Sequence, residues 1–306
     1  MKAVAVASHS FPKNPDLRRE LLERYPDARF NETRKPLKGD DLIGFLRGYS
    51  KAITGLERLD DVVFRAVPEL RVVSKYGVGL DTIDLEAARR HGVSVRWTPG
   101  VNRQSVAELT IAFMIALARN LMPLAREVRE GVWTHGGGRQ ISSATVGVLG
   151  CGHVGQIVAR ICRALGAQVI AHDIVAHTDF DREYGVRAVT REALLRESDF
   201  VTIHVPLDES TRGLIGAAEL ALMKPSAFLI NTARGGIVDE AALRQALVDH
   251  RISGAACDVF AVEPPLDTEL IAHPNFVGTP HVGGSTVEAV LAMGRAAIAG
   301  LDQDSD

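Results

Sequence analysis

The sequence predicts an α/β protein built from two doubly wound parallel-sheet domains. Short β-branched runs alternate with helix-like segments along the 306 residues, a pattern typical of parallel strands joined by helices. The alternation stops once, at a long helix-like segment from about Ser105 to Gly131, and starts again at Thr145. The length is sufficient for two domains that each bury a core. We therefore expect one domain on each side of the interruption.

Each series contains several expected strands, bounded by glycine, proline or polar residues. In the first series they are residues 2–8, 51–56, 70–76 and 92–98, and the segment "IDLEAARRH" forms a helix between the last two. In the second series they are residues 145–150, 167–173, 199–205, 227–233, 252–259 and 275–281.

The composition excludes several classes of function. Hydrophobic residues make up 46% of the chain, charged residues make up 24%, and the net charge is -3. Lysine and arginine form no basic block, so we expect no nucleic-acid partner. The apolar run at residues 109–118 is too short to cross a bilayer, so no membrane partner is expected. The three cysteines, Cys151, Cys162 and Cys257, show no metal-ligand spacing. Their odd number favours reduced thiols, a cytoplasmic location and no metal site.

The strongest single motif is "TVGVLGCGHVGQIVARICRALGAQVIAHDI". Gly150, Gly152 and Gly155 form G-x-G-x-x-G between an expected strand and an expected helix. In this context the glycines permit a tight turn, close approach of a pyrophosphate, and helix-to-strand packing. Asp173 ends the next strand, where a carboxylate binds the ribose hydroxyls of NAD and repels the extra phosphate of NADP. The motif therefore predicts an NAD site in the second domain.

Three later strands of the same domain end in chemically suited side chains. Arg234 follows "AFLINTA", Glu263 lies in "CDVFAVEPP", and His281 lies in "GTPHVGGST". Reduction of a 2-keto acid needs a planar cation for the substrate carboxylate, a proton donor for the carbonyl oxygen, and an anion that orients the donor. Arg234, His281 and Glu263 match these needs in that order. Alternatively, Arg234 is a surface residue paired with Asp239 or Glu240.

Several long motifs resemble the D-isomer-specific 2-hydroxyacid dehydrogenases, most nearly the 3-phosphoglycerate dehydrogenase branch. In the second half of the chain they are "LGCGHVGQIVA", "HVPLDESTRGLIG", "KPSAFLINTARGGIVDEAAL", "GAACDVFAVEPP" and "PHVGGSTVEA". In the front half they are "KYGVGLDTIDLEAARRHGVSV" and "VAELT". The resemblance covers nearly the whole chain, and the motifs occur in the order of the family.

The resemblance implies an NAD-dependent oxidoreductase with two Rossmann/flavodoxin-like domains. The substrate (catalytic) domain would comprise residues 1–99 and 284–306, the NAD-binding domain residues 100–283, and the active site the cleft between them. Arg234, Glu263 and His281 fall on the catalytic positions of the family. The backbone amides of Val78 and Gly79 fall where the family binds the substrate carboxylate. The resemblance also implies a homodimer through the coenzyme domain and an arm near residues 120–140, which contains Trp133.

The expected cofactor contacts combine the glycine motif with positions implied by the resemblance. They are Gly150, Gly152, His153, Val154, Gly155, Asp173, His204, Val205, Pro206, Thr211, Thr232, Ala233, Asp258 and Gly283.

The chain departs from the phosphoglycerate dehydrogenase pattern in two places. Thr54 and Gly55 stand where that branch usually has Arg-Ser, so an expected partner for a substrate phosphate is missing. Three cations are possible substitutes, and each is equally well explained as a surface charge: Arg58, Lys75 and Arg103. The chain also stops soon after its last helix, so we expect no serine feedback through an added regulatory domain.

Two alternative functions keep the same fold, and a third is a metal-dependent enzyme. A formate or phosphite dehydrogenase would change the hydride donor, but its subfamilies place a different residue where Glu263 stands. A corepressor-type binding module would sense NAD(H) without turnover, and only the intact set of Arg234, Glu263 and His281 argues against it. A metal-dependent enzyme lacks ligand spacing among its ten histidines. The substrate side chain, the presence of a phosphate on it, and the physiological direction stay open.

Overall fold

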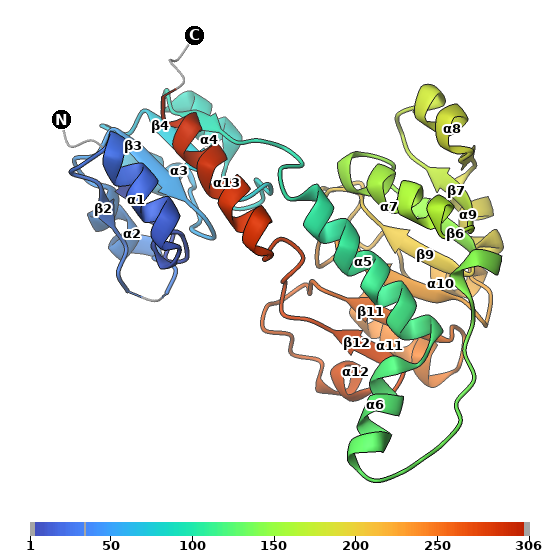
Figure 1. The fold of residues 1–306 in the computed structure, drawn as a ribbon. Helices are drawn as coiled ribbons and strands as arrows, with labels where there is room; N and C mark the ends of the chain where they lie inside the picture. The colour runs from blue at the N-terminus through green and yellow to red at the C-terminus, as the bar shows by residue number, and fades with distance from the viewer. Residues whose placement is uncertain (1–3, 34, 303–306) are drawn as a thin grey trace. The chain divides into compact units, whose positions relative to one another are not determined.

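The computed structural model describes residues 4–33 and 35–302 (Figure 1). The chain divides into two compact units, each described here by itself. The terminal unit comprises Met1–Asn102 and Thr286–Asp306, and the central unit comprises Arg103–Ser285. Each unit contains one parallel sheet covered by helices on both faces, which confirms the predicted fold class.

The terminal unit has a five-stranded parallel sheet in the order β2-β1-β3-β4-β5. This is the flavodoxin-like order, in which the first strand lies between the second and third. The strands are β1 (Ala5–Val6), β2 (Arg29–Phe30), β3 (Lys51–Thr54), β4 (Val72–Lys75) and β5 (Ser94–Arg96). The helices are η1 (Phe11–Lys13), α1 (Pro15–Arg24), α2 (Gly39–Leu46), α3 (Asp61–Ala66), α4 (Leu85–Arg90) and α13 (Val287–Gly300).

Helices from both ends of the chain pack on one face of this sheet. Leu17 and Leu21 of α1 share a buried cluster with Ala297 and Ile298 of α13. The other face carries α2, α3 and α4, as the cluster that contains Leu42, Phe64 and Ala87 shows. The last helix therefore completes the first domain, as Figure 1 shows for α1 and α13.

The central unit has a seven-stranded parallel sheet in the order β12-β11-β10-β9-β6-β7-β8. The strand order reverses between β6 and β9, which is the topological switch point at which such sheets bind ligands. The strands are β6 (Thr145–Leu149), β7 (Gln168–His172), β8 (Arg187–Ala188), β9 (Phe200–Ile203), β10 (Phe228–Asn231), β11 (Gly254–Cys257) and β12 (Phe276–Gly278). The helices are α5 (Arg103–Ala118), α6 (Leu121–Arg129), η2 (Ile141–Ser143), α7 (His153–Ala164), α8 (Thr178–Tyr184), α9 (Arg191–Glu197), α10 (Ala217–Leu222), α11 (Glu240–Val248) and α12 (Thr268–Ala272).

Two buried clusters hold the helices of the central unit on its sheet. Met114 of α5 and Val158 of α7 pack with Val148 of β6 on one face. Leu194 of α9 and Leu243 of α11 belong to the cluster of the other face. The carboxyl ends of the strands, and the loops that follow them, are left at one edge of the sheet.

The structure corrects the sequence prediction in three respects. The expected helix at 105–131 is two helices, α5 and α6, which are bent by 65°. The break contains Asn120 at a φ of 51°, a left-handed conformation that a continuous helix cannot contain. The two-residue strands β2 and β8 were not predicted. The first strand is shorter than residues 2–8, and residues 2 and 3 lie outside the described residues.

Across residues 4–33 and 35–302, no single helix is long and apolar enough to cross a membrane. Helices α5 and α6 meet the length and composition criteria only when they are taken together.

Candidate active site

Two of the three fingerprint glycines are required by the protein's own packing. Gly150 follows β6 at a φ of +93°, and a Cβ there would lie 2.8 Å from the carbonyl carbon of His204. A Cβ on Gly155 would lie 2.1 Å from the Gly150 carbonyl oxygen. These contacts bring α7 and the end of β9 against the turn, as the sequence predicts for the first and third glycines.

Gly152 has no such packing requirement. A Cβ there would meet no atom of the described chain within 4 Å, and its φ of -82° lies outside the left-handed region that favours glycine. Gly152 is the N-cap of α7, so His153 and Val154 begin the helix. The first-turn amides of a helix have no intrahelical acceptor and bind anions. The space at the Gly152 Cβ position, beside the start of α7, is open in the described chain.

Asp173 connects the fingerprint to the end of β7. Its Oδ2 accepts a hydrogen bond from the Cys151 amide at 2.6 Å, and its Oδ1 accepts one from the Val175 amide at 2.9 Å. His177 Nε2 lies 3.5 Å from Asp173 Oδ2, and His177 Nδ1 lies 3.4 Å from Gln156 Nε2. The carboxylate is therefore oriented before any ribose is bound. Burial raises the pKa of Cys151 to about 12, so this thiol stays protonated.

The segment after β9 contains four expected cofactor contacts. His204 Nε2 lies 2.9 Å from Thr202 Oγ1, and burial lowers the pKa of His204 to about 3. Its ring is therefore neutral near pH 7. Val205 borders Gly150, because a Cβ on that glycine would lie 2.8 Å from the Val205 nitrogen. Thr211 Oγ1 donates to the Pro206 carbonyl at 2.6 Å, and this bond connects the two ends of the loop at residues 206–211.

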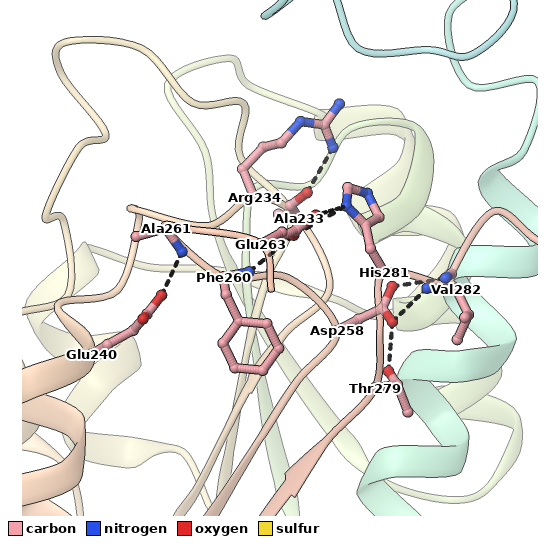
Figure 2. A network of polar contacts seen from close by, with 11 residues as sticks. Ala233, Arg234, Glu240, Asp258, Phe260, Ala261, Glu263, Thr279, His281 and Val282 are labelled. Carbon is pink, nitrogen blue, oxygen red and sulfur yellow. Dashed lines mark hydrogen bonds and ion pairs between the residues drawn. The ribbon is translucent and has the colours of Figure 1, made fainter. Parts of the chain in front are cut away.

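Asn231, the last residue of β10, forms hydrogen bonds with the loop that contains Arg234. Asn231 Nδ2 donates to the Arg234 carbonyl at 2.9 Å, and Asn231 Oδ1 accepts from the Ala233 amide at 3.1 Å. The Arg234 side chain donates from Nη1 to the Ala233 carbonyl at 2.7 Å. A Cβ on Gly235 would lie 1.9 Å from the Phe260 carbonyl oxygen, so this loop approaches the next one backbone to backbone. Arg234 thereby lies beside the loop that contains Glu263 (Figure 2).

Glu263 and His281 form a direct pair. His281 Nδ1 lies 2.9 Å from Glu263 Oε2 and 3.1 Å from Oε1. The Phe260 amide donates to Glu263 Oε1 at 3.1 Å, which fixes the carboxylate from its own loop. The side chains of His281 and Glu263 are 46% and 40% exposed, so a ligand can reach them. Figure 2 shows the Glu263 carboxylate directed at the imidazole ring.

A buried carboxylate holds the histidine loop. Asp258 accepts hydrogen bonds from the Thr279 hydroxyl at 2.5 Å, the Val282 amide at 2.8 Å and the Gly283 amide at 2.7 Å. The His281 amide donates to the Asp258 carbonyl at 2.8 Å. These bonds hold His281 at a φ of 54°, a conformation uncommon outside glycine.

Several expected site residues are occupied by contacts within the protein. Asp258 and Gly283 bond to each other, and the Thr232 hydroxyl lies 2.8 Å from that of Thr110. The two acids considered as partners for Arg234 both bond to backbone amides. Asp239 caps α11 through the Ala242 amide, and Glu240 accepts from Ala261 at 2.6 Å.

The front-half candidates lie in different settings. Val78 and Gly79 follow β4 in the terminal unit and are partly exposed. Arg58 is 84% exposed and lies 3.7 Å from Asp60. Lys75 is buried and donates to Gly55 and Thr82. Arg103 is exposed at the start of α5.

The sequence did not predict the roles of Asn231 and Glu240 at this site. Each side chain forms hydrogen bonds with backbone groups of a neighbouring loop. A polar residue at the end of an apolar strand was the only signal for Asn231, and its partners could not be identified from the sequence.

The comparisons with known proteins place these features in a family. Residues 111–283 match the family model described as D-isomer specific 2-hydroxyacid dehydrogenase, NAD binding domain. The chain is 40% identical over 238 residues to a hydroxypyruvate reductase of Thermotoga maritima, which covers 76% of each chain. It is 40% identical over 244 residues to a D-3-phosphoglycerate dehydrogenase of Methanocaldococcus jannaschii, which covers 79% of this chain and 46% of that relative. The chain thus spans about half of the length of the second relative. A D-lactate dehydrogenase of Aquifex aeolicus, solved with NAD and lactic acid, superposes with a TM-score of 0.86 at 25% identity over 97% of this chain and 93% of that one.

Proposed function

Because the chain belongs to the D-isomer-specific 2-hydroxyacid dehydrogenase family and is an NAD-dependent oxidoreductase, we propose that it interconverts a small D-2-hydroxy acid and its 2-keto acid. The observation that carries this proposal is the Glu263–His281 pair at 2.9 Å, on loops beside Arg234 and at the carboxyl ends of a nucleotide-binding sheet. A guanidinium, an imidazole and its carboxylate partner supply the three functions that keto-acid reduction needs.

In this proposal His281 is the general acid. Glu263 holds Nδ1, which selects the tautomer and directs Nε2 toward a ligand. His281 then donates a proton to the carbonyl oxygen during reduction and accepts it during oxidation. NADH, when bound, supplies the hydride to the carbonyl carbon. Arg234 binds the substrate carboxylate through two parallel hydrogen bonds, and the amides of Val78 and Gly79 are proposed as further donors to it.

The cofactor is proposed to lie along the loops of the central unit. The α7 amides at His153 and Val154 would bind the pyrophosphate beside Gly152, and Asp173 would bind the ribose hydroxyls. Both proposals rest on the open space at Gly152 and on the prior orientation of Asp173. The remaining contacts proposed are Gly150, Gly155, His204, Val205, Pro206, Thr211, Thr232, Ala233, Asp258 and Gly283.

The test compares His281→Asn with His135→Asn, which changes an exposed histidine of the same unit. NADH oxidation is measured with phosphohydroxypyruvate, glyoxylate, hydroxypyruvate and pyruvate, and NADH binding is measured by calorimetry. His281→Asn is expected to lower turnover by about 10² to 10⁴ while NADH binding persists. Unchanged turnover would remove His281 from the chemistry. NADH binding without turnover of any keto acid by the unmodified protein would favour the NAD(H)-sensing alternative.

We also propose that the protein is a cytoplasmic homodimer. Helix α6 has no buried residue, and Leu121, Met122 and Val128 are exposed near Trp133, which is 78% exposed. A second copy of the chain would cover this apolar surface. Sedimentation analysis is expected to give a dimer that Trp133→Asp weakens. The cytoplasmic location rests on the three buried thiols.

A further inference from the structure

The loop that contains Glu263 has few hydrogen bonds to the rest of the protein. It comprises residues 259–266, between β11 and α12. Within the described residues, one hydrogen bond joins the backbone of this loop to another element: the Ala261 amide donates to Glu240 Oε1 at 2.6 Å. Glu240 is the first residue of α11. The position of the loop therefore depends on a side chain of a neighbouring helix.

Two consecutive amides of this loop donate to two different glutamates (Figure 2). The Phe260 amide donates to Glu263 Oε1 at 3.1 Å, and the Ala261 amide donates to Glu240. The peptide between Phe260 and Ala261 also lies against Gly235, where a Cβ would be 2.0 Å from the Phe260 carbonyl carbon. A peptide unit is planar, so contacts with Glu240 and Gly235 fix the direction in which the chain continues toward Glu263.

Helix α11 holds the far end of the loop as well. Arg244 lies one turn after Glu240, and its Nε donates to Asp267 Oδ2 at 3.0 Å. Asp267 directly follows the loop and caps α12. In the described part of the chain, no backbone group of residues 262–266 forms a hydrogen bond. The segment that contains Glu263 is therefore suspended between two contacts with α11, at Ala261 and at Asp267.

The bond between Glu240 and Ala261 is suited to fixing geometry more than to adding stability. Phe260 is packed in a buried cluster, but Ala261 is exposed, so water can replace a lost acceptor at little cost. The loop of Arg234 is held separately, through the hydrogen bonds of Asn231. Loss of the Glu240 side chain is therefore expected to displace Glu263 and to leave Arg234 in place.

We propose that Glu240 is a positioning residue for the proton donor: its hydrogen bond to the Ala261 amide holds Glu263 against Nδ1 of His281. Glu240 touches neither substrate nor cofactor in this role and acts through Glu263. The inference rests on the proposed function, in which His281 transfers the proton, and it assigns a residue outside the set of Arg234, Glu263 and His281 to that step.

The kinetic test uses the fastest of the four keto acids named above. NADH oxidation is followed in single turnovers, so that product release does not mask the chemical step. In Glu240→Ala the rate constant at saturating keto acid is expected to fall about tenfold or more, because proton transfer is sensitive to small displacements. The half-saturating keto acid concentration and the Kd for NADH are expected to stay within about twofold, since Arg234 and the cofactor loops are held by other contacts.

Two conservative variants identify the hydrogen bond as the cause. Glu240→Gln keeps an oxygen that can accept from the Ala261 amide and is expected to retain at least half of the rate constant. Glu240→Asp keeps the charge but shortens the side chain by one methylene, so it is expected to resemble Glu240→Ala. A thermal melt verifies that each variant is folded. Glu240→Asp replaces Glu240→Ala in the comparison if the alanine variant does not fold.

Asp239→Ala is the matched control for a merely structural role. Asp239 precedes Glu240 and also accepts from a backbone amide, that of Ala242 at 3.0 Å. This bond caps α11 and does not reach residues 259–266. The control therefore removes a carboxylate and a hydrogen bond from the same helix start. It is expected to lower the melting temperature and to leave the rate constant within about twofold of its original value.

A second readout does not depend on turnover. NMR spectra of the full chain with isotope-labelled histidine report the chemical shifts of the ring nitrogens, and the His281 signals are those absent from His281→Asn. The Nδ1 shift depends on the hydrogen bond with Glu263. It is expected to move in Glu240→Ala and to be unchanged in Glu240→Gln and Asp239→Ala.

Four results would overturn the proposal. They are an unchanged rate constant in folded Glu240→Ala, no recovery in Glu240→Gln, an equal loss in Asp239→Ala, and an unmoved His281 signal in Glu240→Ala. The proposed function fails separately. If no 2-keto acid oxidises NADH while the His281 signal moves as expected, the reaction is wrong and the positioning of Glu263 by Glu240 stands. If His281→Asn abolishes turnover and Glu240→Ala does not lower it, the role of Glu240 is wrong and the reaction stands.

Discussion

The second fingerprint glycine offers a way to separate cofactor binding from folding. In Gly152→Ala the added methyl group would meet no described atom within 4 Å, and the backbone φ of -82° lies outside the left-handed region. The substitution therefore removes no internal contact. We expect the free energy of unfolding to change by less than about 1 kcal/mol, as measured by urea denaturation.

The same methyl group would enter the space beside the first-turn amides of α7. A pyrophosphate bound there must approach the backbone closely, so the methyl group would force it away from its donors. We expect the Kd for NADH to rise at least tenfold, which corresponds to about 1.4 kcal/mol. Calorimetric titration of NADH measures this change.

Gly155→Ala provides the contrast within the same motif. Its Cβ would lie 2.1 Å from the Gly150 carbonyl oxygen, which is backbone and cannot rotate away. We expect this variant to lose about 1–3 kcal/mol of stability or to fail to fold. The reasoning is refuted if Gly152→Ala binds NADH as tightly as the unmodified protein, or if it is destabilised as much as Gly155→Ala.

Three further predictions concern single side chains of the central unit. Arg234→Lys keeps the charge but loses the two-pronged geometry, so kcat/KM is expected to fall by about 10² or more; near-normal kinetics would assign Arg234 a structural role. Asp173→Asn removes the charge that would repel the NADP phosphate, and the preference for NAD over NADP in kcat/KM is expected to fall at least tenfold; an unaltered ratio would contradict the ribose assignment. Burial holds the pKa of His204 near 3, below its ordinary 6.5, so the unfolded chain binds this proton at a higher pH than the native protein does. Stability is therefore expected to fall as the pH drops from 6.5 toward 3, by at most about 1.4 kcal/mol per pH unit for this group. Urea denaturation at several pH values should show a shallower decline for His204→Gln, and identical slopes would contradict the assignment.

Strand and helix patterns were readable where the elements are long and buried. The runs that became β3, β4, β6, β9 and β10 are apolar and β-branched, and they form the centres of the two sheets. The edge strands β2 and β8 pair with one neighbour over two residues, so no apolar period marks them. The break between α5 and α6 was missed because Asn120 adopts a positive φ within a sequence whose helical period continues on both sides.

The site could be predicted as a set of strand ends, but its internal bonds could not. Glu263 and His281 stand at two strand ends in the sequence, and the structure brings them to 2.9 Å. That approach depends on the Asp258 carboxylate, which holds the histidine loop through Thr279, Val282 and Gly283. The expectation that Asp258 contacts the cofactor stays a prediction. Its position in the motif could not show that its carboxylate also accepts hydrogen bonds from Thr279, Val282 and Gly283.

Glu57 shows the same limit in the terminal unit. A glutamate after a Thr-Gly turn is ordinarily a solvated side chain, and Lys75 was equally well explained as a surface charge. Burial changes the meaning of both residues, because a buried charge must be satisfied within the fold or by a ligand. The Gly55 peptide satisfies one oxygen of Glu57 and part of the Lys75 ammonium, while Glu57 Oε1 is left without a donor in the described part of the chain. The missing arginine of the phosphoglycerate dehydrogenase pattern is therefore not replaced by Lys75 as a phosphate partner.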